Sequence, residues 1–308
     1  MLSRISESLF WIGRYVERAE DTCRILNVHQ QLLVDDPQID ETVAAQELLR
    51  VMGVAESEGV AAPAAVSQAL FHDDDSPCSV TASLFGAREA ARRARETVSA
   101  EMWEAVNGTW FSVSGGRLQR MRPAAAFVHV QERCAVIAGL ADSTMSRDEG
   151  WSFFTLGRSL ERADMTARLI AASMSVGSKS AWNIVLRGCG AHHAFIRTYG
   201  GATSDRDAAE FLLLDRLFPR SIVFTLNLAE EVLVDLEQGR RRAGFGDEAL
   251  RLIGNARATL EYRPKNEILN DLQERMTHLQ QVCNRVTRAV SARYFEGAIA
   301  PEWHGGEW

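Results

Sequence analysis

The 308-residue sequence lacks the short motifs that mark the common enzyme classes. It has no GxSxG nucleophile turn, no Walker A phosphate loop, no GxGxxG dinucleotide loop and no HExxH zinc motif. No apolar run reaches the roughly 18 residues that a membrane span needs, and the first segment is too charged for a signal peptide. A net charge of −7 gives no general basic surface for nucleic acid. We therefore expect a cytoplasmic protein with neither a membrane nor a nucleic-acid partner.

Cysteine is scarce, and its spacing excludes two kinds of site. The five cysteines are an odd number, and no pair has CxxC spacing, so neither a zinc site nor a disulfide framework is indicated. Cys23, Cys134 and Cys283 fall on apolar helical stripes, so we expect buried, reduced thiols. We expect no metal and no cofactor.

Strand-like alternation is also lacking, whereas apolar residues step by three and four through most of the chain. One such stripe runs through Leu9, Ile12, Val16, Ala19 and Cys23. The seven prolines fall between the stripes, where helices begin or end. This pattern predicts an all-α protein that folds as a helical bundle.

The most informative feature that is present is an internal repeat. SLFWIGRYVERAEDTCRIL begins at Ser8, and SFFTLGRSLERADMTARLI begins 144 residues later, at Ser152. The two copies share a Gly-Arg pair and a Glu-Arg pair at equal spacing. A duplication is the simplest explanation. It predicts two divergent, pseudo-symmetric helical repeats, residues 1–145 and residues 146–308, packed as one compact unit.

On a helical wheel, Gly13, Glu17, Glu20 and Arg24 gather on a flank beside the apolar stripe. A glycine inside a helix costs about 1 kcal/mol relative to alanine, so a simple surface helix would not hold one here. Gly13 and its counterpart Gly157 therefore predict close approach by another backbone. The charged flank would then lie inside the molecule, where each charge needs a partner.

The charged residues of the two copies offer each other such partners. The expected pairs within a copy are Glu20 with Arg24 and Asp164 with Arg168, and those between copies are Glu17 with Arg162 and Glu161 with Arg18. With the two glycines, these residues form the expected structural motif. This interpretation gives the motif a role in stability.

Two interpretations give the same residues a function. In the first, Glu17 or Glu161 acts as an acid/base. In the second, arginines clamp a phosphate or carboxylate, and the candidates for this ligand-binding role are Arg14, Arg18, Arg158 and Arg162. A carboxylate metal site is disfavoured, because the Glu-x-x-His pattern of di-metal bundles is missing and arginines compete for the carboxylates.

At these residues the sequence resembles the bacterial Alpha-E family, an α-helical domain with a Glu-Arg motif. The motif is matched by Glu17-Arg18 in GRYVERAED and by Glu161-Arg162 in GRSLERADM. The stretch from Ala87 to Asn107 resembles the family's ARENARxxRE…SxExWExxN pattern, with Ala90 where the pattern has Asn. Residues 210–221 resemble a further block of the family.

The resemblance implies a two-repeat helical fold in the company of circularly permuted ATP-grasp proteins and transglutaminase-like proteases. It therefore implies a helical accessory protein that binds an ATP-grasp amide ligase, with such a protease as a further partner. No catalytic residue carries over from the family, and we favour a protein that is not an enzyme. The alternative is an enzyme or an anionic-ligand-binding module with a Glu/Arg site between the two repeats.

Overall fold

The computed structural model describes residues 2–54, 63–175, 181–200, 204–237 and 248–295. Within these ranges the chain forms fourteen α-helices and no strand, which confirms the all-α prediction. The helices are α1 (Ser3–Asp35), α2 (Glu41–Met52), α3 (Pro63–Ser67), α4 (Val80–Arg93), α5 (Ala100–Ser114), α6 (Pro123–Thr144), α7 (Glu149–Ser175), α8 (Ala181–Gly188), α9 (His192–Tyr199), α10 (Asp205–Leu214), α11 (Ile222–Leu236), α12 (Glu248–Tyr262), α13 (Lys265–Asn270) and α14 (Leu272–Tyr294). A short π-helix, η1 (Gln68–His72), and a short 3₁₀ helix, η2 (Leu118–Arg120), complete the described elements.

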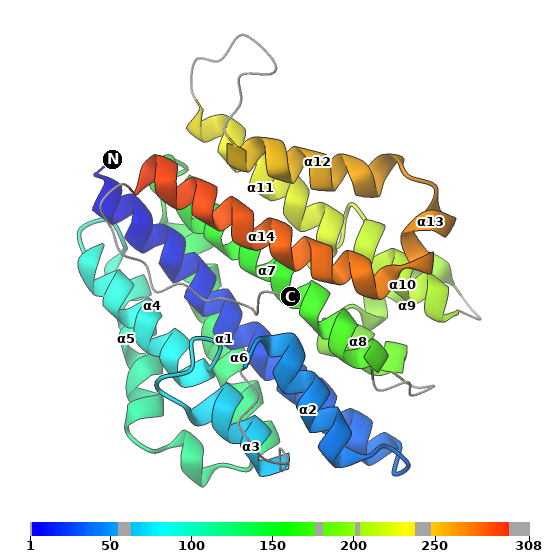
Figure 1. Ribbon diagram of the computed structural model, residues 1–308. Coiled ribbons are helices and arrows are strands. Elements are labelled where there is room, and N and C mark those ends of the chain that lie inside the picture. Colours follow the sequence, from blue (N-terminus) through cyan, green and yellow to red (C-terminus); the bar gives the residue numbers. More distant parts are fainter. Residues whose placement is uncertain (1, 55–62, 176–180, 201–203, 238–247, 296–308) are drawn as a thin grey trace.

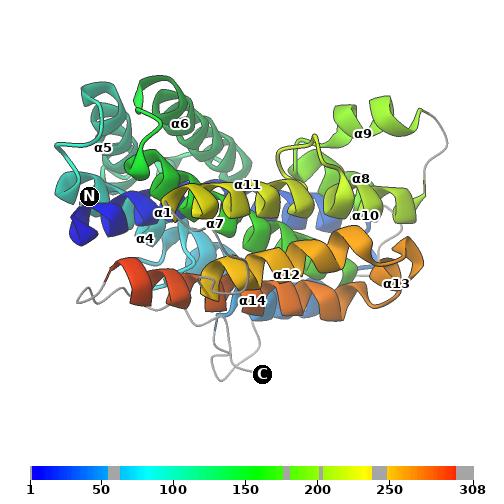
Figure 2. The same cartoon turned by 90° about the horizontal axis from the view of Figure 1, so that it is seen from above.

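The two longest helices, α1 and α7, lie side by side at the centre of the molecule (Figures 1 and 2). α1 packs against α4 and α6, and α5 joins those two helices. α7 packs against α11 and α14, and α12 joins those two. In addition, α8 of the second half contacts α1, and α2 of the first half contacts α7. Both central helices are therefore covered on most sides.

The helices begin where the sequence supplies caps. The side chains of Asp40, Ser79 and Ser221 accept hydrogen bonds from the first turns of α2, α4 and α11. Pro123 is the first residue of α6, where a missing N–H is tolerated. Capping side chains and prolines are local signals, so they allow helix boundaries to be predicted from the sequence. Pro301 lies outside the described residues.

The core is apolar and contains the cysteines. All five are buried and free of disulfides. The predicted burial of Cys23, Cys134 and Cys283 on helical stripes is confirmed. Burial raises the pKa of the Cys283 thiol, as it does for Cys23 and Cys134, so none of these three is poised as a thiolate.

Helix α6 has the length and hydropathy of a membrane span, and it is the one such helix in the described part of the chain. Its Phe127, Val130 and Cys134 are buried, and α6 packs against α1 and α5. A buried core helix passes the same test of length and composition. The expectation of no membrane partner stays a prediction.

The close approach predicted from the two glycines is confirmed. A Cβ added to Gly13 would lie 2.2 Å from the backbone oxygen of Phe154, and one added to Gly157 would lie 2.1 Å from the backbone oxygen of Phe10. Both distances are far below van der Waals contact, and backbone atoms cannot move aside as side chains do. The glycines therefore let α1 and α7 cross with their backbones in contact.

We predict that Gly13→Ala lowers the free energy of unfolding by about 1–3 kcal/mol or more, because the added methyl group forces the two central helices apart. Gly139→Ala in α6 is the matched control, since a Cβ there meets nothing within 4 Å. The control should raise the free energy of unfolding by about 0.5–1 kcal/mol through helix propensity. Urea unfolding of both variants makes the comparison. Equal effects of the two substitutions would contradict the close crossing.

Candidate functional site

At the crossing of α1 and α7, Glu161 of α7 accepts hydrogen bonds from two arginines of α1. The Nε of Arg14 lies 2.5 Å from Glu161 Oε2, and the Nε of Arg18 lies 2.6 Å from Glu161 Oε1. A second nitrogen of Arg18 also donates to Glu161, at 3.0 Å. Arg14 donates in addition to the hydroxyl of Thr287 on α14. Both oxygens of this fully buried carboxylate are therefore occupied.

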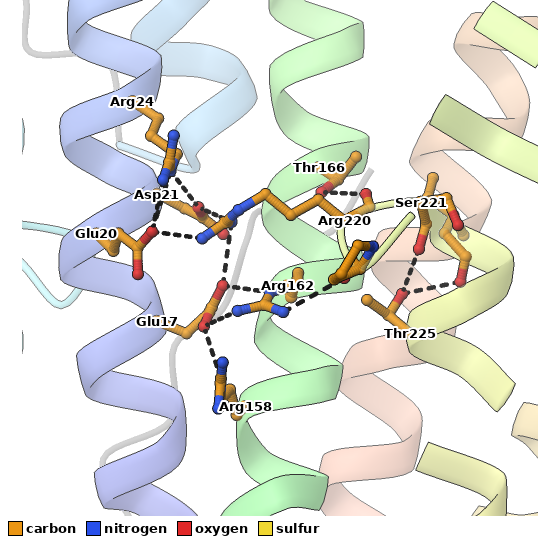
Figure 3. A network of polar contacts seen from close by, with 12 residues as sticks. Glu17, Glu20, Asp21, Arg24, Arg158, Arg162, Thr166, Arg220, Ser221 and Thr225 are labelled. Carbon is orange, nitrogen blue, oxygen red and sulfur yellow. Dashed lines mark hydrogen bonds and ion pairs between the residues drawn. The ribbon is translucent and has the colours of Figure 1, made fainter. Parts of the chain in front are cut away.

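The reciprocal contact joins Glu17 of α1 to α7 (Figure 3). The Nε and an outer nitrogen of Arg162 donate to the two oxygens of Glu17 at 2.5 and 2.8 Å. Arg158 lies 3.4 Å and Arg220 lies 3.1 Å from the same carboxylate. The pairing predicted between the two copies of the Glu-Arg motif is confirmed in both directions.

The arginine of each Glu-Arg motif also donates a hydrogen bond to a loop. The loop is the one that leads into α4 for Arg18 and into α11 for Arg162. Arg18 donates to the backbone oxygen of Pro77 just before α4, and Arg162 donates to that of Pro219 just before α11. One position further on, Thr22 donates to Cys78 O. The same arrangement therefore recurs around α1 and α7.

The expected pairs within each helix are also present. Arg24 lies 2.7 Å from Glu20, and Arg168 lies 2.9 Å from Asp164. Each arginine reaches beyond its own helix to the C-terminal end of a short helix from the other half. Arg24 donates to the backbone oxygen of Gly188 in α8. Arg168 donates to that of Val51 in α2, and cations are favoured at such helix ends.

Arg220, in the connection between α10 and α11, distinguishes the Glu17 side from the Glu161 side (Figure 3). Besides Glu17, it contacts Glu20 and Asp21, each at 2.5 Å. The corresponding connection on the other side carries Cys78 before its capping serine. The Glu17 side is therefore a larger network that joins α1, α7 and the start of α11.

The two sides also differ in their access to water. On the Glu161 side the side chains of Arg14 and Arg18 are 2% exposed. On the Glu17 side, Arg158 is 23% exposed and Arg162 and Arg220 are 11% exposed. Solvent can therefore reach the Glu17 network.

The surroundings keep both motif glutamates ionised. Burial by itself raises the pKa of Glu17, but the charges of the adjacent arginines, above all Arg162, outweigh it and lower the pKa to about 2. Burial also opposes ionisation of Glu161, and Arg14 and Arg18 again bring its pKa below the ordinary value. A general acid/base exchanges its proton near neutral pH, so this geometry does not favour that role for either glutamate.

The pKa of Asp21 shifts in the opposite direction from those of the two glutamates. Burial raises its pKa to about 7, because Arg220 offsets only part of the burial, and the charges of Glu17 and Glu20 add to the rise. Its Oδ2 is buried without a hydrogen-bond partner. Burial likewise raises the pKa of Asp164, whose Oδ1 also has no partner.

The four candidate ligand-binding arginines differ in how fully they are engaged. Arg14, Arg18 and Arg162 all donate to carboxylates and to a second acceptor. Arg158 makes two longer ion pairs, at 3.4 Å to Glu17 and at 3.6 Å to Asp142. Its Nε has no hydrogen-bond partner. Of the four, Arg158 therefore has the most capacity for an additional ligand.

The sequence interpretation overlooked Arg220, Asp21 and Thr287 as members of the network. Arg220 follows a proline and precedes a capping serine, as Cys78 does. That shared pattern marks two equivalent connections and could have indicated that both lie against the Glu-Arg helices. In the described residues, no group of three or more His, Cys, Asp or Glu side chains is arranged to hold a metal ion.

Comparison with known protein families identifies one family for this chain. Residues 1–295 match Alpha-E, described as "a predicted alpha-helical domain with a conserved ER motif". Similar proteins include uncharacterized proteins from Mycobacterium bovis, 26% identical over 262 residues, and from Mycobacterium tuberculosis, 25–26% identical over the same length. Each match covers 76% of this chain, which spans only 30% of the relative's length. No solved structure gives a significant match.

We predict that two of the three α1 carboxylates that contact Arg220, Asp21 and Glu17, respond oppositely when their charge is removed. Because the pKa of Asp21 is raised from 3.8 to about 7, its contribution to stability is present below 3.8 and is lost as the pH rises through 7. Asp21→Asn mimics the protonated acid, so it should raise the free energy of unfolding by about 1–4 kcal/mol near pH 8. The gain should shrink near pH 5, where the wild-type side chain is already largely protonated.

Glu17→Gln is the contrasting variant. The pKa of Glu17 is lowered from 4.5 to about 2, so its stabilisation is present above 4.5 and is lost as the pH falls through 2. At neutral pH this variant leaves arginines without their charge partner and should lose about 3–5 kcal/mol. Urea unfolding of both variants and the wild type at the two pH values gives the measurement. A loss for Asp21→Asn as large as that for Glu17→Gln would refute the assignment.

Proposed function

Because the chain belongs to the Alpha-E family, we propose that it is a non-catalytic helical accessory protein of a cytoplasmic ATP-grasp amide-ligase system. The observation that carries this proposal is the state of the two motif glutamates. Glu17 and Glu161 are buried, their pKa values are lowered, and both oxygens of each are held by arginines. Such carboxylates stabilise a scaffold and are poorly suited to transfer protons.

We also propose that the scaffold arose by duplication, with residues 1–145 and 146–308 as the two repeats. Equivalent contacts support this history. Gly13 faces Phe154 as Gly157 faces Phe10, and Glu17 binds Arg162 as Glu161 binds Arg18. α1 packs with α4 and α6 as α7 packs with α11 and α14. α2 of the first repeat contacts α7 of the second, and α8 of the second contacts α1 of the first. These contacts would make the two repeats fold as one unit.

The proposed partner follows from the family resemblance, which implies circularly permuted ATP-grasp proteins and transglutaminase-like proteases as companions. The mycobacterial relatives support a role beside other domains, since a region like this chain fills only 30% of their length. A helical scaffold with a rigid ionic centre suits a subunit that binds and orders a ligase. The ligase would supply the ATP chemistry and the amide-bond formation.

One observation supports a second candidate function, the binding of an anionic ligand. Arg158 is partly exposed and its Nε has no hydrogen-bond partner, while the neighbouring Arg162 and Arg220 are also reached by solvent. Guanidinium groups of this kind bind carboxylates and phosphates. An anionic-ligand-binding module, or an enzyme built on such a site, is therefore the alternative to the accessory role.

We predict that the chain co-purifies with an ATP-grasp ligase encoded in the same system and raises its rate of amide formation, while the chain alone has no turnover. The measurement is co-expression with one tagged partner, followed by ligase assays with and without this protein. Arg158→Met tests the alternative, because it removes the partly exposed guanidinium of Arg158 and leaves the pairs of Glu17 with Arg162 and of Glu161 with Arg18 in place. Clean separation at micromolar concentration, with unchanged ligase activity, would contradict the accessory role. Turnover by the isolated chain that Arg158→Met abolishes would establish the alternative.

A further inference from the structure

A small polar cavity lies between α2, α7 and α14, away from the Glu17 network. α7 packs against both other helices, and the three meet on one side of the molecule (Figure 1). The cavity has a volume of about 40 Å³. A water molecule needs roughly 10–15 Å³ of such volume, so the space admits one planar polar group or a few waters.

One wall of the cavity is a row of uncharged polar side chains on α14. The row, which we call the α14 polar stripe, consists of Gln273, Thr277, Gln280 and Asn284. Steps of four, three and four residues place these side chains on one helix face, and all four are half-buried. The exposed positions of the same segment carry Glu274, His278 and Arg285, and also Gln281, which adds a further carboxamide at the edge of the cavity. The stripe is therefore distinct from the ordinary charged surface of the helix.

Two oxygen atoms of the α14 polar stripe can each accept a hydrogen bond from an N–H group of a ligand. The Oε1 of Gln273 is buried and has no hydrogen-bond partner. The hydroxyl of Thr277 donates its one hydrogen to the backbone oxygen of Gln273, so it can only accept from a ligand. A primary carboxamide has two N–H groups for these two acceptors. Its own oxygen can accept from the carboxamide of Gln280, which lies about one helical turn beyond Thr277.

The charges around the cavity disfavour a simple anion. The buried Arg168 is neutralised by Asp164 at 2.9 Å, and Arg50 by Glu47 at 2.6 Å. An anion has no hydrogen to donate to Gln273. The side chain of Arg50 is 35% exposed, so its guanidinium, which is paired with Glu47, is also within reach of a ligand on the solvent side of the cavity. A carboxylate attached to the bound amide would lie favourably there.

We propose that this cavity binds the primary carboxamide of a small molecule that also carries a carboxylate. The carboxamide enters between α7 and the α14 polar stripe, and the carboxylate stays near Arg50. This assignment goes beyond the accessory role and does not depend on it, since the chain alone provides every contact.

Calorimetric titration of the full-length chain with L-glutamine tests the proposal. L-Glutamate is the matched probe, because it has the same shape without the two N–H groups. We expect L-glutamine to bind, and L-glutamate to bind at least about tenfold more weakly. Thr277→Val keeps the side-chain volume and removes the acceptor, and it should weaken L-glutamine binding about tenfold.

Thr259→Val on α12 is the control variant. Thr259 makes the same hydroxyl contact to the backbone four residues earlier, to Asn255, but it does not line the cavity. This control should bind L-glutamine as the wild type does. Absence of L-glutamine binding would show a site that holds only water and overturn the proposal. Equal affinity for L-glutamate, or unchanged binding by Thr277→Val, would overturn it as well.

Discussion

The architecture depends on charged side chains that are held between two helices whose backbones touch. Gly13 and Gly157 bring α1 and α7 together, and the glutamates one turn further along are then buried between the two helices. A buried carboxylate without a partner would be strongly destabilising, so each must meet an arginine of the opposite helix. The reciprocal pairs of Glu17 with Arg162 and Glu161 with Arg18 meet this requirement. The arginines extend the same constraint outward to the connections before α4 and α11.

The two sides of this ionic centre differ in composition and in their access to water. The Glu161 side is excluded from water and its arginines are saturated, which suits a purely structural role. The Glu17 side carries Arg220 and Asp21, is reached by solvent, and contains a carboxyl group with a pKa of about 7. Protonation of Asp21 therefore changes the charge on the Glu17 side, whereas Glu161 stays ionised between Arg14 and Arg18.

Much of the fold could be predicted from the sequence, because helical period, proline positions and capping serines are local signals. The pairs between the two copies could also be predicted, since the repeat places equivalent charges opposite each other once Gly13 and Gly157 require contact. Arg220 could not be assigned in this way, because it lies in a connection and reaches Glu17 only through the packing of α11 on α7. The pKa of Asp21 depends on burial and on four neighbouring charges, so it needs the three-dimensional structure. The α14 polar stripe is visible in the sequence, but its cavity exists only where α2 and α14 meet α7.

A double-mutant cycle on Arg18 and Glu161 tests the central claim most directly, because it isolates the coupling between the two central helices. Arg18→Met, Glu161→Met and the double variant would each be unfolded in urea beside the wild type. The account predicts a coupling of about 1–3 kcal/mol, with the double variant more stable than the sum of the single losses implies. It also predicts that each single variant is strongly destabilised, because a buried charge loses its partner. Additive effects, with a coupling near zero, would show that the Glu-Arg contact does not hold α1 against α7.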